Sequence, residues 1–190
     1  MATLPTVPAD TSVADLLSKL MPGIVEDLLA KNSAAQELSG TQISMVVEVN
    51  GEKYAYTLKD GKSLLFTKGD ISGSNMYIKI TEDDLNKMIQ TQNLDMLFGL
   101  QSDLNKSKYN ALNSLKGSFT AEIANEDGYT FKIEAVLNGA QQPHSIFKMS
   151  AKDTAALMRK DTNPVNLFMS GAMKIEGDMS FAMATQPLFS

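Results

Sequence analysis

The sequence predicts one fused body that combines α-helices with β-hairpins. Two stretches of alternating apolar residues, each interrupted by a tight-turn signal, predict the hairpins. Each hairpin is followed by further strand candidates and then by a helix with its own N-terminal cap. This order occurs twice along the chain, which predicts an internal pseudo-repeat.

The composition is that of a globular protein, and it excludes several classes of function. The 190 residues are 43% hydrophobic and 21% charged. The chain has no Cys and a single His, which excludes a disulfide scaffold, a cysteine nucleophile and a multi-histidine metal site. A net charge of −5 gives no general attraction to phosphate backbones, so we expect no nucleic-acid partner.

The first residues do not have the pattern of a secretory signal. Residues 1–11 carry no positive charge and no long apolar run. We therefore expect a flexible N terminus at 1–11, followed by a single body at 12–190. No stretch reaches the ~18 apolar residues that a membrane helix needs, and the expected location is the cytoplasm.

Two helical pieces are predicted before the first hairpin. Ser12 caps the first piece, with Asp15 three residues later. Apolar residues then form one stripe, which Pro22 interrupts because proline lacks the amide hydrogen that a helix interior needs. We expect helices at about 12–21 and 22–31.

The first hairpin unit begins where the spacing of apolar residues changes from a helical to an alternating pattern. Apolar residues occupy every second position from 43 to 49, and Asn50-Gly51 suits a tight turn. Further strands are expected at 54–58, 63–67 and 76–80. Thr81 then has the position of an N-terminal cap, and it opens a helix.

The second unit repeats this order. Asp127-Gly128 marks its turn, and Ser150 has the position of a helix cap. Matching residues keep a regular spacing, as for Phe98 and Phe168, which lie 70 positions apart. The predicted segments are repeat units at about 40–101 and 117–171, a connecting helix at 102–115, and a C-terminal strand and helix at 172–189.

The C-terminal run carries the most informative motif. Asn163-Pro164 opens a predicted helix, and Lys-Ile-Glu-Gly-Asp at 174–178 predicts a strand that leads into a Met-containing helix. This run closely resembles the signature of sterol carrier protein type 2-like (SCP-2) domains. Weak similarity covers 12–189, and the tight match is confined to 146–183. Members of this family are usually little more than half this length, so the duplicated unit is a departure.

The resemblance implies an α+β fold with a mostly antiparallel sheet, helices packed on one face, and an apolar tunnel between the layers. It also implies non-enzymatic lipid binding or transfer, with a fatty acid, acyl-CoA or sterol-like lipid as the ligand. Transient membrane contact and oligomerisation stay open. The alternative is a scaffold or accessory module for an enzyme of lipid or quinone metabolism, without a ligand of its own.

Flexible apolar side chains near the C terminus are the candidate lining of such a tunnel. Methionine is unbranched and polarizable, so it adapts to ligands of varied shape, although it fills ordinary cores for the same reason. The candidate ligand-binding residues are Phe131, Met149, Phe168, Met169, Met173, Ile175, Met179, Phe181, Met183 and Leu188.

Catalytic patterns are not evident in the sequence. It contains no Gly-x-Ser-x-Gly nucleophile elbow and no phosphate-binding glycine loop. The acidic run at 82–84 is interpreted as helix capping, since carboxylates stabilise the first turn of a helix. We expect no catalytic residue, no metal and no cofactor, and an enzyme is the least favoured interpretation.

Overall fold

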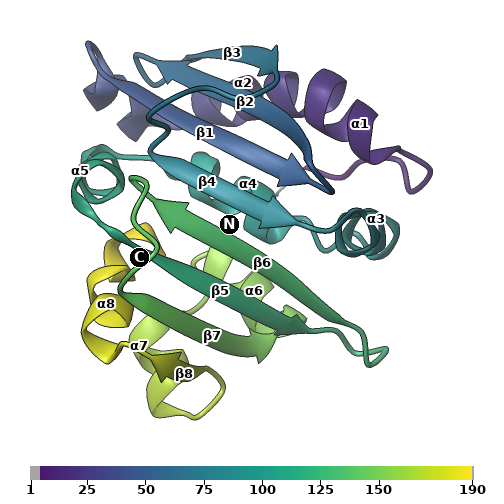
Figure 1. The fold of residues 1–190 in the computed structure, drawn as a ribbon, viewed down its shortest axis with the longest axis vertical. Helices are drawn as coiled ribbons and strands as arrows, with labels where there is room; N and C mark the ends of the chain where they lie inside the picture. Colours follow the sequence, from purple (N-terminus) through teal and green to yellow (C-terminus); the bar gives the residue numbers. More distant parts are fainter. Residues whose placement is uncertain (1–4, 190) are drawn as a thin grey trace.

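One eight-stranded sheet runs through the computed structural model, which describes residues 5–189 (Figure 1). The strands are β1 (Gln42–Val49), β2 (Glu52–Lys59), β3 (Ser63–Lys68), β4 (Met76–Ile80), β5 (Gly117–Ala124), β6 (Thr130–Leu137), β7 (His144–Ser150) and β8 (Lys174–Gly177). Their order across the sheet is β3-β2-β1-β4-β6-β5-β7-β8. Five of the seven pairings are antiparallel, which confirms the predicted α+β fold with a mostly antiparallel sheet.

The two hairpin units have the same local topology. In the first unit, β1 and β2 form a hairpin, and β4 pairs with β1 in parallel. In the second, β5 and β6 form the hairpin, and β7 pairs with β5 in parallel. The units join where β4 pairs antiparallel with β6, while β3 and β8 lie at the two outer edges. The Asn50-Gly51 turn has positive φ at both residues, 48° and 88°, as that dipeptide predicts.

A single continuous helix covers the first unit, where the sequence predicts two. It comprises α1 (Val13–Asp15), a π-helical segment η1 (Leu16–Leu20) and α2 (Met21–Lys31). The amide of Met21 donates to the carbonyl of Leu16, which closes a wider turn just before Pro22. Because Pro22 then lies in the first turn of α2, its missing amide hydrogen does not break the helix.

The segment before α1 is attached to the rest of the protein at Val7. Its side chain is buried, its amide donates to Oε1 of Gln92, and its carbonyl accepts from Nε2 of the same side chain. The predicted flexible segment 1–11 thus includes a fixed contact within its described part. Residues 1–4 of that segment lie outside the described residues.

The remaining helices follow their predicted caps closely. They are α3 (Glu82–Thr91), α4 (Asp95–Ser102), α5 (Lys106–Ser114), α6 (Ala151–Met158), α7 (Pro164–Met169) and α8 (Met179–Ala184), with 3-10 segments η2 (Ser33–Leu38) and η3 (Gln186–Leu188). The side chains of Thr81, Ser150 and Asn163 each accept from the amide three residues later, which confirms all three predicted caps.

The predicted connecting helix at 102–115 corresponds to α5, which begins later than predicted because residues 103–105 form a break after α4. Asn105 caps α5 by accepting from the amide of Lys108. The Lys108 side chain is itself buried and forms an ion pair with Asp103. Burial lowers the pKa of Lys108 to about 8, and the hydrogen bond that its ammonium group donates to Asp103 opposes this shift.

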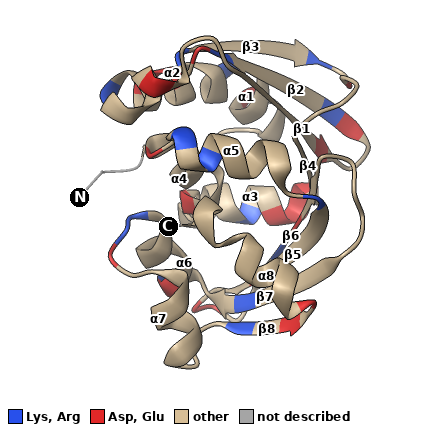
Figure 2. Cartoon of the chain, turned by 90° about the vertical axis from the view of Figure 1, so that its left-hand side faces the viewer, with Lys and Arg blue, Asp and Glu red and all other residues tan. Residues whose placement is uncertain are grey.

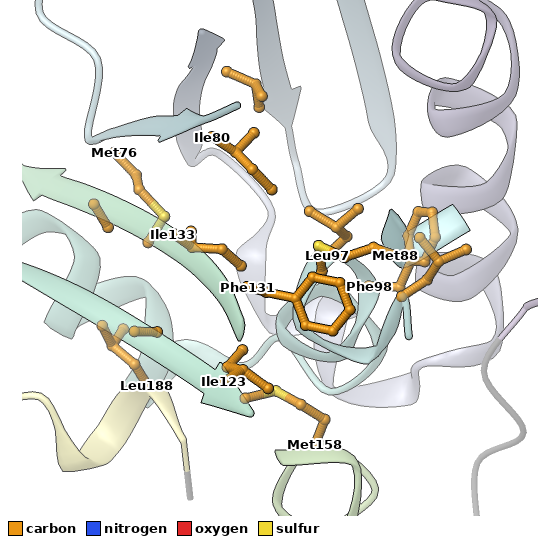
Figure 3. Close-up of a cluster of buried hydrophobic side chains, with 14 of the residues drawn as sticks. Met76, Ile80, Met88, Leu97, Phe98, Ile123, Phe131, Ile133, Met158 and Leu188 are labelled. Carbon is orange, nitrogen blue, oxygen red and sulfur yellow. The ribbon is translucent and has the colours of Figure 1, made fainter. Parts of the chain in front are cut away.

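The hydrophobic core lies between the sheet and the helices. Figure 3 shows side chains from the strands and from α3, α4, α6 and η3 meeting in this layer, among them Met88, Phe98, Phe131 and Met158. In the side view of Figure 2, the helices stand on one side of the sheet. Any cavity between these layers is therefore walled by apolar side chains on both sides.

Candidate functional site

An apolar cavity of about 220 Å³ lies between the second unit of the sheet and the helices that cover it. We call it the main cavity. Its floor is made by side chains that alternate along three strands and face the helices, because strand side chains alternate between faces. These are Phe119 and Ala121 of β5, Phe147 and Met149 of β7, and Ile175 of β8.

Short helices from the C-terminal part of the chain form the cover of the main cavity. They contribute Leu157 and Met158 of α6, Pro164, Val165, Phe168 and Met169 of α7, and Ala182 and Met183 of α8. Met173, Thr185, Gln186 and Phe189 complete this side, and Met96 of α4 contributes from the first unit. Asn163 caps α7 directly before Pro164, so a local sequence signal sets where this helix of the cover begins.

Three aromatic rings meet at one wall of the main cavity. The ring centroids of Phe119 and Phe147 lie 5.7 Å apart, and that of Phe189 lies 5.9 Å from Phe119 and 6.4 Å from Phe147. All three contacts are edge-to-face, with interplanar angles of 63–78°. This arrangement favours a fixed position for each ring, so the wall is firmer than its methionine-rich surroundings.

Large apolar side chains are exposed to solvent along the cover. Met169 is 78% exposed, Met183 is 50% exposed and Phe168 is 41% exposed, although all three line the main cavity. Val165 of α7 and Met179 of α8 are exposed in the same helices. Neither helix contains a charged residue, and both are drawn in tan in Figure 2. The cavity thus opens to solvent through an uncharged apolar rim.

Six of the ten residues predicted as lining come together at the main cavity: Met149, Phe168, Met169, Met173, Ile175 and Met183. The other four lie elsewhere. Phe131 belongs to the packed core shown in Figure 3, and Leu188 lines a neighbouring cavity. Phe181 is buried against Gly117, whereas Met179 is half exposed on the rim.

Sequence reasoning missed several lining residues that a simple pattern contains. The missed residues Phe119 and Ala121 alternate along a predicted strand, and the missed Phe147 lies two positions before the predicted Met149; all four face the cavity. A prediction that included every helix-facing position of these strands would have found the missed residues. Met96 gives no such signal, because it comes from the first unit and reaches the cavity through the packing of α4.

No charged side chain among the described residues lines the main cavity. The polar members of its lining are Thr185 and Gln186, and the hydroxyl of Thr185 donates to the carbonyl of Ala182. Among residues 5–189, no group of three or more His, Cys, Asp or Glu could hold a metal ion. The site is suited to contacts with an apolar molecule and offers no fixed charge to an ionic one.

None of the helices between residues 5 and 189 combines the length and the apolar character needed to cross a membrane.

Residues 99–190 match the model of the SCP-2 sterol transfer family. The C-terminal half of the chain is therefore an SCP-2-like domain, which confirms the resemblance of its C-terminal motifs. This matched region contains nearly the whole lining of the main cavity, with Met96 as the exception.

Solved structures of low identity resemble parts or most of the chain. The apo form of sterol carrier protein 2 from Yarrowia lipolytica is 18% identical, over 42% of this chain and 76% of that chain, with a TM-score of 0.34. The solution structure of sterol carrier protein domain 2 of Helicoverpa armigera is 22% identical, over 54% and 84%, with a TM-score of 0.37. A structure titled UbiJ-SCP2 ubiquinone synthesis protein is 10% identical, over 94% and 93%, with a TM-score of 0.31. No curated protein matches the chain.

Proposed function

We propose that this protein binds and transfers a lipid, which it holds in the main cavity between the sheet and helices α6, α7 and α8. The observation that carries the proposal is the coincidence of two independent findings. A 220 Å³ cavity with an uncharged, almost wholly apolar lining lies within the region that matches the SCP-2 sterol transfer family. The mechanism is equilibrium sequestration without chemistry, driven by the burial of apolar ligand surface.

The size of the main cavity sets limits on the ligand. An apolar cavity of about 150 Å³ stays dry and is large enough for benzene, whereas sites for drug-sized ligands begin at about 300 Å³. At 220 Å³, the main cavity holds part of a lipid without rearrangement. A longer chain must displace methionine side chains, which have the rotational freedom to move.

The energetics also favour a ligand longer than the main cavity. Burial of apolar surface contributes roughly 25 cal/mol per Å², and a micromolar Kd corresponds to about 8 kcal/mol. More than roughly 300 Å² of ligand surface must then be buried, before the costs of association are counted. A fatty acid, acyl-CoA or sterol-like lipid offers this much surface.

The exposed apolar rim on α7 and α8 provides the route of entry in this proposal. Phe168, Met169 and Met183 are each in contact with both the cavity and solvent. A membrane surface is the partner that suits such a rim, because its interior is the source of the apolar ligand and accepts uncharged side chains. Transient contact of these two helices with a membrane would let a lipid pass without crossing water.

A pair of alanine substitutions tests the proposal. Ala182 is buried on α8 and lines the main cavity, whereas Ala155 is buried on α6 and does not line it. Ala182→Leu fills cavity space, so we expect about tenfold weaker displacement of a fluorescent fatty acid and an increased melting temperature. Ala155→Leu overpacks a filled site, so we expect a decreased melting temperature with little change in the affinity of the folded protein.

Two measurements on the wild-type protein provide the decisive control. Organic extraction of the purified protein followed by mass spectrometry should detect a bound lipid, and the delipidated protein should bind the fluorescent fatty acid. Failure to find any lipid, together with no binding of the fluorescent fatty acid, would contradict the proposal. The alternative, an accessory module without its own ligand, would then account for the exposed rim as a contact surface for a protein.

A further inference from the structure

Two smaller apolar cavities lie beside the main cavity, between the first unit of the sheet and its helices. One of about 70 Å³ shares Met96, Phe119, Met158 and Phe189 with the main cavity. The other, of about 60 Å³, lies further toward β2 and β3 and shares Met21, Met45, Met76, Leu100 and Gln101 with the 70 Å³ cavity. We call these two the inner cavities.

The three cavities form a row along the sheet, because each neighbouring pair shares lining residues. The boundaries are formed largely by methionine and aromatic side chains. Nine of the twelve methionines of the chain line at least one of the three spaces. Rotation of these flexible side chains, without any movement of the backbone, would join the spaces.

A polar side chain without a partner for its oxygen interrupts the largely apolar lining of the inner cavities. Oε1 of Gln101, near the end of α4, is buried and has no hydrogen-bond partner in the described part of the chain. Gln101 lines both inner cavities, and no charged side chain in residues 5–189 lines either of them. A buried acceptor without a donor costs free energy, so a hydrogen-bond donor from outside the protein would stabilise this atom.

The chemistry of this atom selects the kind of partner. An amide oxygen accepts one hydrogen bond from an uncharged hydroxyl, and this satisfies the oxygen and the hydroxyl at once. A carboxylate offers no donor to Oε1. Even if the amide turned over to present its NH₂, one neutral donor would not compensate the burial of a full charge. The surroundings therefore favour a neutral lipid alcohol over an ionised fatty acid.

We propose that Gln101 binds the hydroxyl group of a neutral lipid alcohol in the inner cavities, with the apolar body of the lipid extending through the row into the main cavity. The inference rests on the proposed function, and it adds a ligand class, a polar anchor and an orientation. The hydroxyl end lies deep under the first unit, and the apolar end lies toward the rim on α7 and α8.

Three probes with the same alkyl chain test the proposal: hexadecanol, hexadecyl methyl ether and hexadecanoate at neutral pH. Their ability to displace a fluorescent alkyl probe is measured for the delipidated wild type and for Gln101→Leu. We expect the wild type to favour hexadecanol over the methyl ether by about tenfold, since the ether lacks a donor. In Gln101→Leu this preference should fall to about one, while the affinity for the ether stays equal or increases.

Two further variants keep the test decisive. Gln101→Met replaces the amide with an unbranched apolar side chain and serves if the leucine variant folds poorly. Gln90→Leu, at an exposed position of α3, is the matched control and should keep the tenfold preference. The side-chain amide signal of Gln101 in ¹⁵N-labelled protein should shift with hexadecanol and not with the ether.

The outcomes distinguish this inference from the proposed function. If all three probes bind and Gln101→Leu leaves the alcohol-to-ether ratio unchanged, the anchor role is wrong and lipid binding stands. If hexadecanoate binds more tightly than hexadecanol in the wild type, the ligand class is wrong. If no probe binds, both the proposed function and the anchor are overturned.

Discussion

The two hairpin units share one topology and differ in how their helix-facing surfaces are covered. In the first unit, one continuous helix of 19 residues (Val13 to Lys31) lies over the strands, and Leu16 and Leu17 are fully buried beneath it. In the second, helices of six to eight residues form the cover and leave a 220 Å³ space. The three strands of the hairpin motif are arranged alike in both units, so the main cavity results largely from the cover. The second unit also has an edge strand, β8, beside β7, and this strand adds Ile175 to the cavity floor.

A hydrogen bond fixes the cover of the first unit to its sheet. The hydroxyl of Tyr56, on β2, donates to the carbonyl of Leu17 within the π-helical segment. Burial raises the pKa of Tyr56, so its hydroxyl remains protonated well into the alkaline range. The cover of the second unit instead presents Met169 and Met183 to solvent, where few neighbouring atoms restrict the rotation of these unbranched side chains.

The largest expected effect contrasts the two covers directly. Leu17→Ala should lower the free energy of unfolding by about 3 kcal/mol, because it leaves a hole beneath a rigid helix. Met169→Ala should change it by less than about 0.5 kcal/mol, since this side chain is 78% exposed. Urea denaturation of both variants measures the difference. Equal losses would mean that the second cover is as rigid as the first.

An intermediate effect is expected where β5 supports the second cover. Gly117 has a φ of +152°, and a Cβ added there would lie 2.5 Å from the ring of Phe181. Gly117→Ala should cost about 2 kcal/mol and loosen α8, seen as faster amide exchange in that helix. Gly139→Ala also has a positive φ but has nothing within 4 Å of the new Cβ, so it isolates the effect of backbone strain. An equal loss in both variants would contradict the ring contact.

The smallest expected effect concerns a contact that joins the two units. Asp84 of α3 accepts from the hydroxyl of Tyr129 at 2.5 Å and from the amide of Lys132 at 3.0 Å. Tyr129→Phe should lower the free energy of unfolding by about 1 kcal/mol at neutral pH. Lys132 still donates from its backbone in this variant, so Asp84 keeps one partner.

The same contact predicts a dependence on pH. The hydrogen bond to Asp84 raises the pKa of Tyr129 to about 12, above the value of about 10 for an unfolded tyrosine. The stabilisation from this hydrogen bond is fully present below pH 10 and is lost as the pH rises through 12. Between these values the folded state keeps the tyrosine proton that the unfolded state has released, so a rise in pH favours the unfolded state. Tyr129→Phe should show a shallower loss of stability over this window. Identical slopes would indicate that the bond does not persist in solution.

Local sequence signals predicted the elements of the fold well. The caps at Thr81, Ser150 and Asn163 and the Asn50-Gly51 turn depend on residues within a few positions of one another. The β4–β6 pairing joins residues about 60 positions apart, such as Ile78 and Ala135, and no local pattern encodes it. The single helix through Pro22 depends on a π-helical turn that periodicity does not reveal.

The candidate site was predictable in part for the same reason. A methionine-rich C-terminal segment indicated six lining residues of the main cavity, because the helices that carry them are defined locally. Met96 of α4 reaches the main cavity only through the packing of one unit against the other. Gln101 of the same helix lines the inner cavities because α4 packs against α2. An unpaired amide oxygen is a property of three-dimensional surroundings, and a sequence contains no sign of it.

Crystals grown with hexadecanol provide the most direct measurement, through an experimentally phased electron-density map. The account predicts elongated density that starts in the main cavity beside Phe119 and Phe147 and ends within hydrogen-bond distance of Gln101. Side chains of the protein filling that space, with no density for the alcohol, would contradict it.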